Sequence, residues 1–469
     1  MIKKLVVFVV ILLGFFTAAI ITVKWVKQDG LMVPATRQAI TLDNVNLLKL
    51  APYQVLQQQQ LVIRHGIIEA INPAGTPVAA NSRYIDGNNA YVTPGLFDLH
   101  VHLWDRQYLS QNLAYGVTSV RTMAGQMMHL RWREELKAQQ WLGSNLYISS
   151  PILANENTHA LNEAVDTPKL GRALVQRAHN NGFDFIKAYG YLAPDVYEAI
   201  IDEATKLDMP VAKHGPYPVK GSSWQGLEGL QSLEHVEDIF QGPLNYQFDL
   251  EKLHQVAKQI KQLDVPVVPT LTTFHHLTQL STEKEAFIQS LPIETVNPVH
   301  RAIEQRFTVS RWLASSPEQG QYNLDQMAFL LKIVKVLHQY DVKLVLGTDA
   351  GTMYTIAGLS VHKEMDLLKQ AGLTDVEILR SATVNAAQTL GVYDSYGDIA
   401  VGKVADLILV QGNPGDDIRI LRQPVAVVKN GHWLSAEDLA QMKQGAHQPS
   451  GYFFSAARLF EDLLWRWLF

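Results

Sequence analysis

Residues 95–102 read GLFDLHVH, an apolar run that closes on two histidines. Seven more apolar runs follow it, separated by helical stretches such as PDVYEAIIDEATKLD. The eight runs cover residues 95–102, 116–123, 145–151, 184–189, 210–215, 232–237, 265–271 and 343–350. Repeated β-then-α units of this kind predict a (β/α)8 TIM barrel over residues 94–390. The interval 272–342 is too long for one helix, so we expect several helices there, covering the barrel mouth.

Strand-like segments flank the barrel on both sides, at residues 37–93 and 391–435. Each contains a hairpin signal, His65-Gly66 in the first and Asn430-Gly431 in the second. Neither segment is long enough to bury a core alone. We therefore expect the two to form one small β-sandwich at the two ends of the barrel.

The composition excludes several classes of protein. The chain has 469 residues, of which 47% are hydrophobic and 18% charged, so a large core is expected rather than disorder. Its net charge of -5 offers no basic field to nucleic acid. With no cysteines, it has no disulfides, no cysteine nucleophile and no cysteine zinc site. Its 16 histidines mean that any metal would be bound by nitrogen and oxygen.

The N-terminus predicts a membrane segment. Leu5 to Val23 is a charge-free run of 19 residues, nearly long enough to cross a hydrocarbon core. Lys3 and Lys4 precede it, which favours a cytoplasmic N-terminus. We interpret residues 1–27 as a signal-anchor, with a cleaved signal peptide and a secreted protein as the alternative. The catalytic body would then be membrane-anchored and extracytoplasmic, hence periplasmic in a Gram-negative cell.

The C-terminal tail, residues 436–469, is expected to be helical and amphipathic. From residue 452 onward its polar residues fall on one stripe of a helical wheel, and the rest, including Trp465 and Trp467, is apolar. The stripe consists of Ser455, Arg458, Glu461, Asp462 and Arg466. Two interpretations stay open: a helix docked on the barrel, and an interfacial helix that lies on a membrane.

Polar residues cluster at the ends of the predicted barrel strands, where barrel enzymes place their active sites. His100 and His102 lie at positions i and i+2 of a strand, so both imidazoles point to the same side and can bind one metal. Later strands end with Lys187, His214, His235 and Asp349. A single strand-end histidine is weak support, but the whole set is difficult to ascribe to chance.

These motifs together resemble the amidohydrolase superfamily, and most of all its imidazolonepropionase-related group, which includes Xaa-Pro dipeptidases. The resembling segments are VTPGLFDLHVHLW, GVTSVRTMAG, DFIKAYGYL, SLEHVED, LGTDAG, AGLTDVEILRSATVNAAQTLG and GDIAVGKVADLILVQGNP. The resemblance implies a barrel that carries a β-sandwich built from both ends. It also implies metal-dependent hydrolysis of a carbon–nitrogen bond, with dipeptides and N-acyl amino acids as candidate substrates.

The resemblance assigns a role to each strand-end residue. His100 and His102 would bind a first metal, which Asp349 would complete while also moving the proton. His214 and His235 would bind a second metal. Lys187 stands where relatives carry a carboxylated lysine, a CO2-derived carbamate that bridges two divalent ions, with Zn²⁺ as the default. A hydroxide held between the ions would attack the amide.

Four further residues are candidates for contact with the substrate. His159 matches the position of a substrate-binding histidine in relatives, although its loop lacks the usual glycines. Tyr189 or Tyr191 could steady an oxyanion. Arg121, at the end of the second predicted strand, could face the mouth and pair with a substrate carboxylate.

Three other functions stay open. A mononuclear cyclic amidohydrolase or deaminase is one, although Tyr217 stands where deaminases usually place a glutamate after His214. A phosphotriesterase or lactonase would use the same metal site. A membrane-tethered, non-catalytic binding protein would have lost a ligand position, and every position is filled. We expect a small-molecule amide as partner and no nucleic acid; the oligomeric state stays open.

Overall fold

The computed structural model describes residues 14, 30–78, 80–155, 162–215 and 226–468. The predicted anchor, residues 1–27, lies outside the described residues apart from Gly14, as does His159. Within the described ranges, no helix is both long and apolar enough to cross a membrane.

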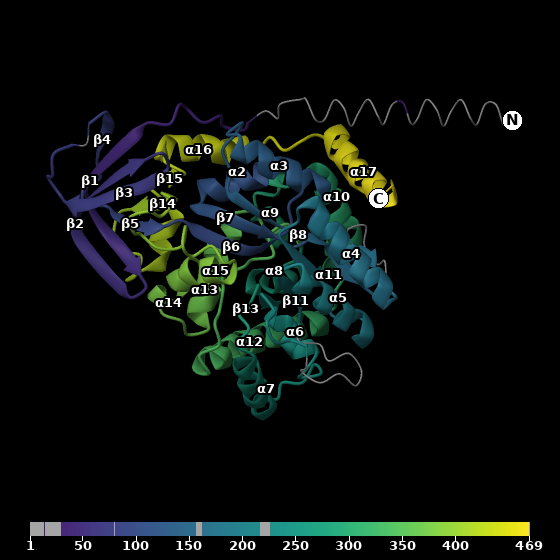
Figure 1. Ribbon diagram of the computed structural model, residues 1–469. Helices are drawn as coiled ribbons and strands as arrows, with labels where there is room; N and C mark the ends of the chain where they lie inside the picture. The colour runs from purple at the N-terminus through teal and green to yellow at the C-terminus, as the bar shows by residue number, and fades with distance from the viewer. Residues whose placement is uncertain (1–13, 15–29, 79, 156–161, 216–225, 469) are drawn as a thin grey trace.

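A nearly closed barrel of parallel strands forms the centre of the molecule (Figure 1). Seven strands follow one another around it in chain order. They are β6 (Leu96–Val101), β7 (Val117–Thr122), β8 (Asn145–Ala154), β10 (Phe185–Ala188), β11 (Val211–His214), β12 (Ser232–Glu234) and β13 (Val267–Val268), and β9 (Asn162–Ala164) pairs with β8. Every residue of β6 and β7 is buried, as expected of strands covered on both faces.

The predicted eighth strand, residues 343–350, closes the barrel without forming a continuous ladder. Single parallel bridges join Leu344 to Val267 of β13 and Ala350 to Val101 of β6. Asp349 has φ 58°, outside the β region, so a ladder cannot run through it. The Asp98 carboxylate secures this segment by accepting hydrogen bonds from the Thr348 amide (3.0 Å) and hydroxyl (2.6 Å).

Helices cover the outside of the barrel, and α7 (Leu250–Leu263) illustrates why they form. Its buried residues Leu253, Val256, Ala257 and Ile260 recur at helical spacing, so one stripe faces the strands. The Asp249 side chain accepts from the Lys252 amide and caps the N-terminus. The other covering helices are α2 (Arg106–Ala114), α3 (Met127–Lys137), α4 (Pro168–Asn181), α5 (Pro194–Lys206), α6 (Val236–Gln241), α13 (Leu359–Gln370), α14 (Asp375–Ser381) and α15 (Val384–Thr389).

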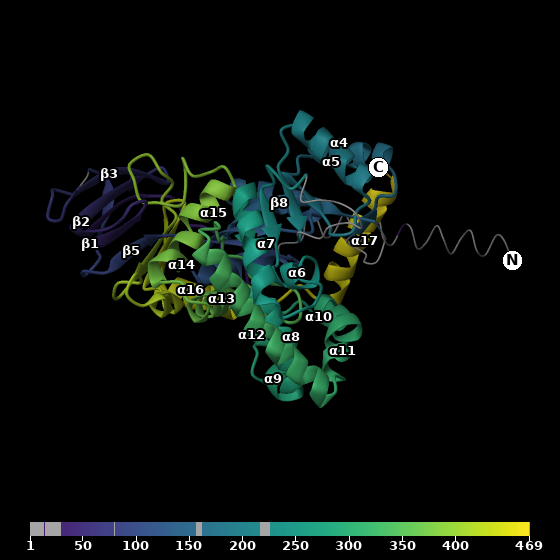
Figure 2. The same cartoon turned by 90° about the horizontal axis from the view of Figure 1, so that it is seen from below.

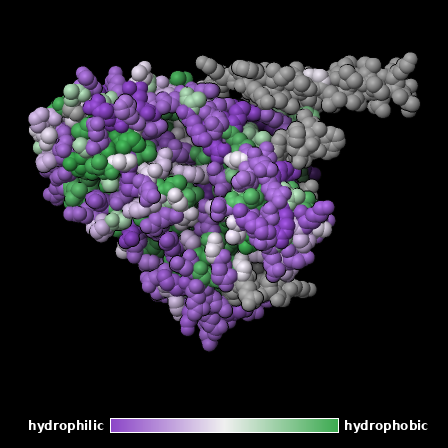
Figure 3. Space-filling model, in the orientation of Figure 1, coloured by the Kyte–Doolittle hydropathy of each residue, from purple (hydrophilic) through white to green (hydrophobic). Residues whose placement is uncertain are grey.

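The two flanking segments pair with each other, as predicted, but they form one connected mixed sheet of eight strands. Strand β14 (Leu407–Val410) pairs antiparallel with β5 (Tyr91–Pro94), which joins the C-terminal segment to the N-terminal one. The remaining strands are β1 (Ala39–Leu50), β2 (Tyr53–Arg64), β3 (Ile67–Pro73), β4 (Ser82–Asp86), β15 (Ala426–Lys429) and β16 (His432–Ser435). Both predicted hairpin turns are present, with positive φ at His65-Gly66 and Asn430-Gly431. Apolar residues gather over this sheet on the face drawn in Figure 3, whereas the surface around the barrel is mainly hydrophilic.

The long interval before residues 343–350 is helical, as predicted. It holds α8 (Leu271–Thr282), α9 (Glu285–Gln289), α10 (Pro298–Glu304), α11 (Ser310–Leu313) and α12 (Pro317–Gln339), and α8 to α11 project from the barrel in Figure 2. The tail forms α16 (Ala436–Gly445) and α17 (Tyr452–Leu468). Helix α17 packs against α3 and α10.

Candidate metal centre

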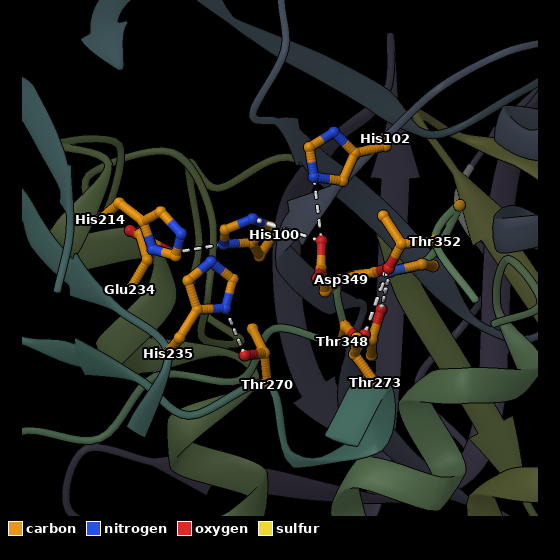
Figure 4. Close-up of polar contacts among 12 residues, drawn as sticks. His100, His102, His214, Glu234, His235, Thr270, Thr273, Thr348, Asp349 and Thr352 are labelled. Carbon is orange, nitrogen blue, oxygen red and sulfur yellow. Dashed lines mark hydrogen bonds and ion pairs between the residues drawn. The ribbon is translucent and has the colours of Figure 1, made fainter. Parts of the chain in front are cut away.

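The strand-end residues predicted as ligands converge at one end of the barrel. His100 is in β6 and His102 follows it, His214 ends β11, and His235 follows β12 (Figure 4). The His102 Nε2 atom lies 2.9 Å from Asp349 Oδ1, and the His100 Nε2 atom lies 3.5 Å from the same oxygen. Residues that are far apart in the chain therefore meet because parallel strands all end at the same rim.

Two overlapping groups of side chains could each hold a metal ion. One ligand atom from each of His100, His235 and Asp349 lies within 4.8 Å of the others, and the same holds for His214, His235 and Asp238. The His235 ring stands between the other two imidazoles, with centroids 4.5 Å from His100 and 4.5 Å from His214. The donors are imidazole and carboxylate only, which suits a divalent ion such as Zn²⁺.

In three of the histidines, Nδ1 is engaged by an oxygen outside this cluster of rings. His100 Nδ1 lies 2.7 Å from Glu234 Oε2, and His214 Nδ1 contacts Asp238 Oδ2. His235 Nδ1 lies 2.7 Å from the Thr270 hydroxyl. In His100 and His235, Nδ1 is therefore the protonated nitrogen, and Nε2 keeps a lone pair for a metal.

The Thr270 hydroxyl shows how the His235 tautomer is specified. It donates its own hydrogen to the Pro269 carbonyl at 2.8 Å. With that hydrogen used, its oxygen can only accept from His235. The His235 Nδ1 atom must therefore carry the proton.

Burial keeps these imidazoles neutral near pH 7. It lowers the pKa of His100 to about 4, and it lowers the pKa values of His214 and His235 well below their usual range. Burial alone would raise the pKa of Asp349, but the adjacent His100 and His102 hold it well below its usual range. The centre therefore offers neutral nitrogens and one ionised carboxylate, the protonation states that metal binding needs.

Lys187, on β10, is buried at 2% exposure, and its Nζ atom has no hydrogen-bond partner among the described residues. Burial lowers its pKa from 10.5 to about 8. A buried amine without a partner is costly, so some group absent from the polypeptide is expected to engage it.

The buried ion pair between Arg121 and Glu234 supports the His100 ring. The Arg121 guanidinium donates to Glu234 Oε1 at 2.7 Å, while the other carboxylate oxygen of Glu234 faces His100. Both Arg121 and Glu234 are fully buried. The expectation that Arg121 faces the mouth is therefore wrong: its side chain points into the barrel, where it also bonds to the Leu99 carbonyl and the Ser232 hydroxyl.

The other predicted contact residues lie in different surroundings. The Tyr189 ring lies 4.2 Å from the His214 ring, and burial raises the pKa of its hydroxyl. Tyr191 is 54% exposed. Tyr189 therefore packs on a histidine of the centre.

Sequence reasoning missed Glu234, Asp238 and Thr270, which hold the Nδ1 atoms. Glu234 directly precedes His235, and Asp238 lies three residues after it in the first turn of α6. Both fall within SLEHVED, so carboxylates around a strand-end histidine were the available signal. Thr270 carried no such signal, because only the fold brings it to His235.

We expect Glu234→Gln to weaken metal binding by about 10- to 100-fold, the usual cost of losing a partner that orients a metal-binding histidine. The amide keeps the shape but removes the charge that holds His100 and Arg121. Competition with a chelator measures the affinity. Glu364→Gln is the matched control, because Glu364 is another fully buried carboxylate and bonds to Leu271 and Thr272 instead. Equal affinities in the two variants would contradict the role of Glu234.

Gly351 allows the segment after Asp349 to approach His102. Its φ is +96°, and a Cβ atom there would lie 2.0 Å from the His102 carbonyl oxygen. We expect Gly351→Ala to lower both metal content and melting temperature. Gly372→Ala is the control for backbone strain without a steric clash. Gly372 also has a positive φ, +104°, but a Cβ atom there would meet nothing within 4 Å. If the two variants lose the same metal and stability, contact with His102 is not the cause.

Comparison with known proteins agrees with this geometry. The sequence model of the amidohydrolase family matches residues 91–434. An imidazolonepropionase of Klebsiella pneumoniae (strain 342) is 26% identical over 419 residues, which is 81% of this chain and 93% of that protein. Among solved structures, bottromycin amidohydrolase gives a TM-score of 0.71 at 23% identity, covering 94% of this chain and 93% of its own. A Xaa-Pro dipeptidase with bound methionine gives 0.66 at 20% identity, covering 85% and 100%.

Proposed function

The chain belongs to the amidohydrolase family and is a metal-dependent hydrolase of carbon–nitrogen bonds; on this premise, we propose which of its residues perform the reaction. The proposed centre holds two divalent ions, with zinc as the default for these donors. Its ligands would be His100, His102, His214, His235, Asp349 and a carbamate on Lys187.

The observation that carries this proposal is the engagement of three Nδ1 atoms. Glu234, Asp238 and Thr270 each contact the Nδ1 atom of one histidine, and the three imidazole rings form a single cluster. Structural histidines need no such shared arrangement. Histidines that bind metals usually have it, because the partner sets both ring orientation and tautomer.

The carbamate accounts for the isolated amine of Lys187. A neutral Nζ can add to the carbon of CO2, forming one N–C bond and releasing one proton. The product carries one negative charge shared by two oxygens, and these oxygens would serve as ligands for the divalent ions. A buried amine with a pKa of about 8 is neutral far more often than an ordinary lysine, which favours this addition.

Asp349 is proposed to carry the proton during hydrolysis. Bound metal ions supply Lewis acidity, polarising the scissile carbonyl and making water acidic enough to ionise near neutral pH. Asp349 is ionised before the reaction, so it can accept a proton from the attacking water and pass it to the leaving nitrogen. Tyr189 is proposed to donate its hydroxyl hydrogen to the oxygen that becomes negative. The products are a carboxylic acid and an amine.

The proposed substrates are dipeptides or N-acyl amino acids. The solved structure of a Xaa-Pro dipeptidase directs the choice of the first compounds to assay. His159 stays a candidate for binding them and awaits mutation. We further propose that residues 1–27 anchor the protein in a membrane with the catalytic body outside the cytoplasm, as their apolar sequence indicates.

Metal analysis on purified protein, combined with a hydrolysis panel, tests the proposal. The panel contains dipeptides, N-acyl amino acids, a lactone and a phosphotriester. About two metal ions per chain, with turnover of an amide, is the expected result. About one ion would indicate a mononuclear site and remove Lys187 from it. Turnover of the lactone or phosphotriester alone would contradict the assigned substrate class.

A further inference from the structure

The C-terminal helix α17 turns its polar side chains toward the protein. Ser455 and Arg458 are buried, and Arg458 Nη1 donates to the Ser450 hydroxyl at 2.9 Å. The Ser455 hydroxyl accepts from Asn297 Nδ2 at 2.7 Å. Asn297 and the Ser450 amide also both donate to Asp105, which caps α2 just after His102. This end of α17 is thus bonded to the loop that follows β6.

The next turns of α17 continue the pattern. Asp462 is buried and accepts from the Met127 amide at 3.3 Å. Glu461 forms two hydrogen bonds with the Arg131 guanidinium, at 2.7 and 3.0 Å. The described part of the polar stripe predicted from the sequence, Ser455 to Asp462, is therefore the docking face of α17, shared with apolar residues such as Ala457.

The opposite face of α17 is apolar where its side chains are described. Tyr452 is 62% exposed, Phe453 is 46% exposed and Ala456 is also exposed. A helix on the surface of a protein in water normally has the reverse arrangement, with its apolar stripe inward. An apolar outer face indicates that its surroundings are not water alone.

The sequence outside the described residues indicates what covers this face. This sequence includes the charge-free run from Leu5 to Val23. The continuous part of the chain that the structure describes begins at Gly30. There the chain touches the end of α16: a Cβ atom on Gly30 would lie 3.0 Å from the Gly445 carbonyl oxygen. Only residues 446–451 separate α16 from α17. A bilayer that takes up residues 5–23 would therefore lie near the outer face of α17.

We propose that the outer face of α17, defined by Tyr452, Phe453 and Ala456, lies in the headgroup boundary of a lipid bilayer. Aromatic side chains favour this boundary, and amphipathic helices enter it with their apolar side about 5–10 Å deep. Because α17 bonds to the loop after β6, this placement brings the mouth side of the barrel toward the membrane. The inference concerns orientation on the membrane and is independent of the proposed chemistry.

The absence of cysteine from the chain makes a direct test possible. Ala456→Cys in the full-length protein gives one site for an environment-sensitive fluorophore on the outer face. Tyr84→Cys is the matched control, since Tyr84 is an exposed residue, at 50%, on the distant strand β4 (Figure 1). Both labelled proteins are reconstituted in vesicles of phosphatidylcholine and phosphatidylglycerol, with and without lipids that carry a nitroxide near the headgroup. Melting temperatures check that both are folded.

We expect emission from position 456 to shift to the blue and to be quenched by the nitroxide lipids several-fold more than emission from position 84. Equal, weak quenching at the two positions would overturn the proposal, as would failure of the full chain to bind vesicles. If the unlabelled Ala456→Cys variant forms disulfide-linked dimers and the labelled position is shielded without quenching, the face belongs instead to a second copy of the chain. Placing the label through Tyr452→Cys repeats the test if the first variant does not fold.

Discussion

Lys187→Ala is expected to lose metal, falling from about two ions per chain to one or fewer. The substitution removes the amine that would become the bridging carbamate, on the strand that lies between β8 and β11. Loss of a residue that only orients a metal ligand costs about 10- to 100-fold in activity. Activity should fall further than this in Lys187→Ala. Metal analysis and turnover on the same sample measure both effects.

Short carboxylic acids should partly restore this variant. A small carboxylate can occupy the space of the truncated side chain and supply two oxygens that share one negative charge, as the carbamate would. Lys213→Met is the control, because Lys213 is also buried but its Nζ already donates to the Gly215 carbonyl at 2.9 Å. It should keep its metal and gain nothing from added acid. Wild-type metal content in Lys187→Ala would rule out the bridge.

The same lysine predicts how metal loading depends on pH. Burial lowers the pKa of Lys187 to about 8, so the reactive neutral amine increases as pH rises through that value. Starting from metal-free protein at a fixed concentration of dissolved CO2, loading should increase about 25-fold in rate between about pH 6.5 and about pH 8.5. An ordinary lysine would still be almost fully charged across this window. A rate that does not change with pH would contradict the role of the free amine.

The positions of the polar residues at the strand ends could be predicted because they depend on local sequence order. Alternation along a strand places His100 and His102 on one side, and the order of β-then-α units places His214, His235 and Asp349 at the same rim. The closing segment differed because Asp349 itself departs from strand geometry, with φ 58°. Local sequence pattern therefore predicted the convergence of these residues better than it predicted the last strand.

The direction of a side chain was harder to predict than its position. Arg121 was expected at the mouth, yet Glu234 draws it into the barrel interior, and the two charges compensate each other there. Asp238 and Thr270 contact the Nδ1 atoms of His214 and His235. Such a contact depends on how an imidazole ring is rotated, and ring rotation produces no periodic pattern in the sequence. On α17, the polar stripe was visible in the sequence, but which side of it faces the body depends on Asp105, Met127 and Arg131.

Asp349→Asn is expected to keep most of its metal while kcat falls by about 100- to 10,000-fold, the range that general acid–base groups contribute. The amide oxygen can still lie beside His102, but the side chain can no longer accept and return a proton. Asp98→Asn is the matched control from the neighbouring strand. Burial raises the pKa of Asp98 to about 7, so it is already partly protonated at neutral pH, and an amide can still accept from Thr348.

Comparing the two variants therefore separates the effect of losing a charge next to the histidines from the effect of changing a buried residue at this junction. Both are buried, and both are held by the junction of β6 with residues 343–350, but only Asp349 lies against the histidine cluster as an ionised group. If proton transfer is its role, Asp349→Asn should lose kcat while keeping its metal, whereas Asp98→Asn should keep most of its kcat and lose mainly thermal stability. Near wild-type kcat in Asp349→Asn with metal bound would assign the proton transfer to another group. Loss of metal from Asp349→Asn alone would instead mean that Asp349 acts mainly as a ligand, and equal loss from both variants would mean that disturbing the junction releases the metal.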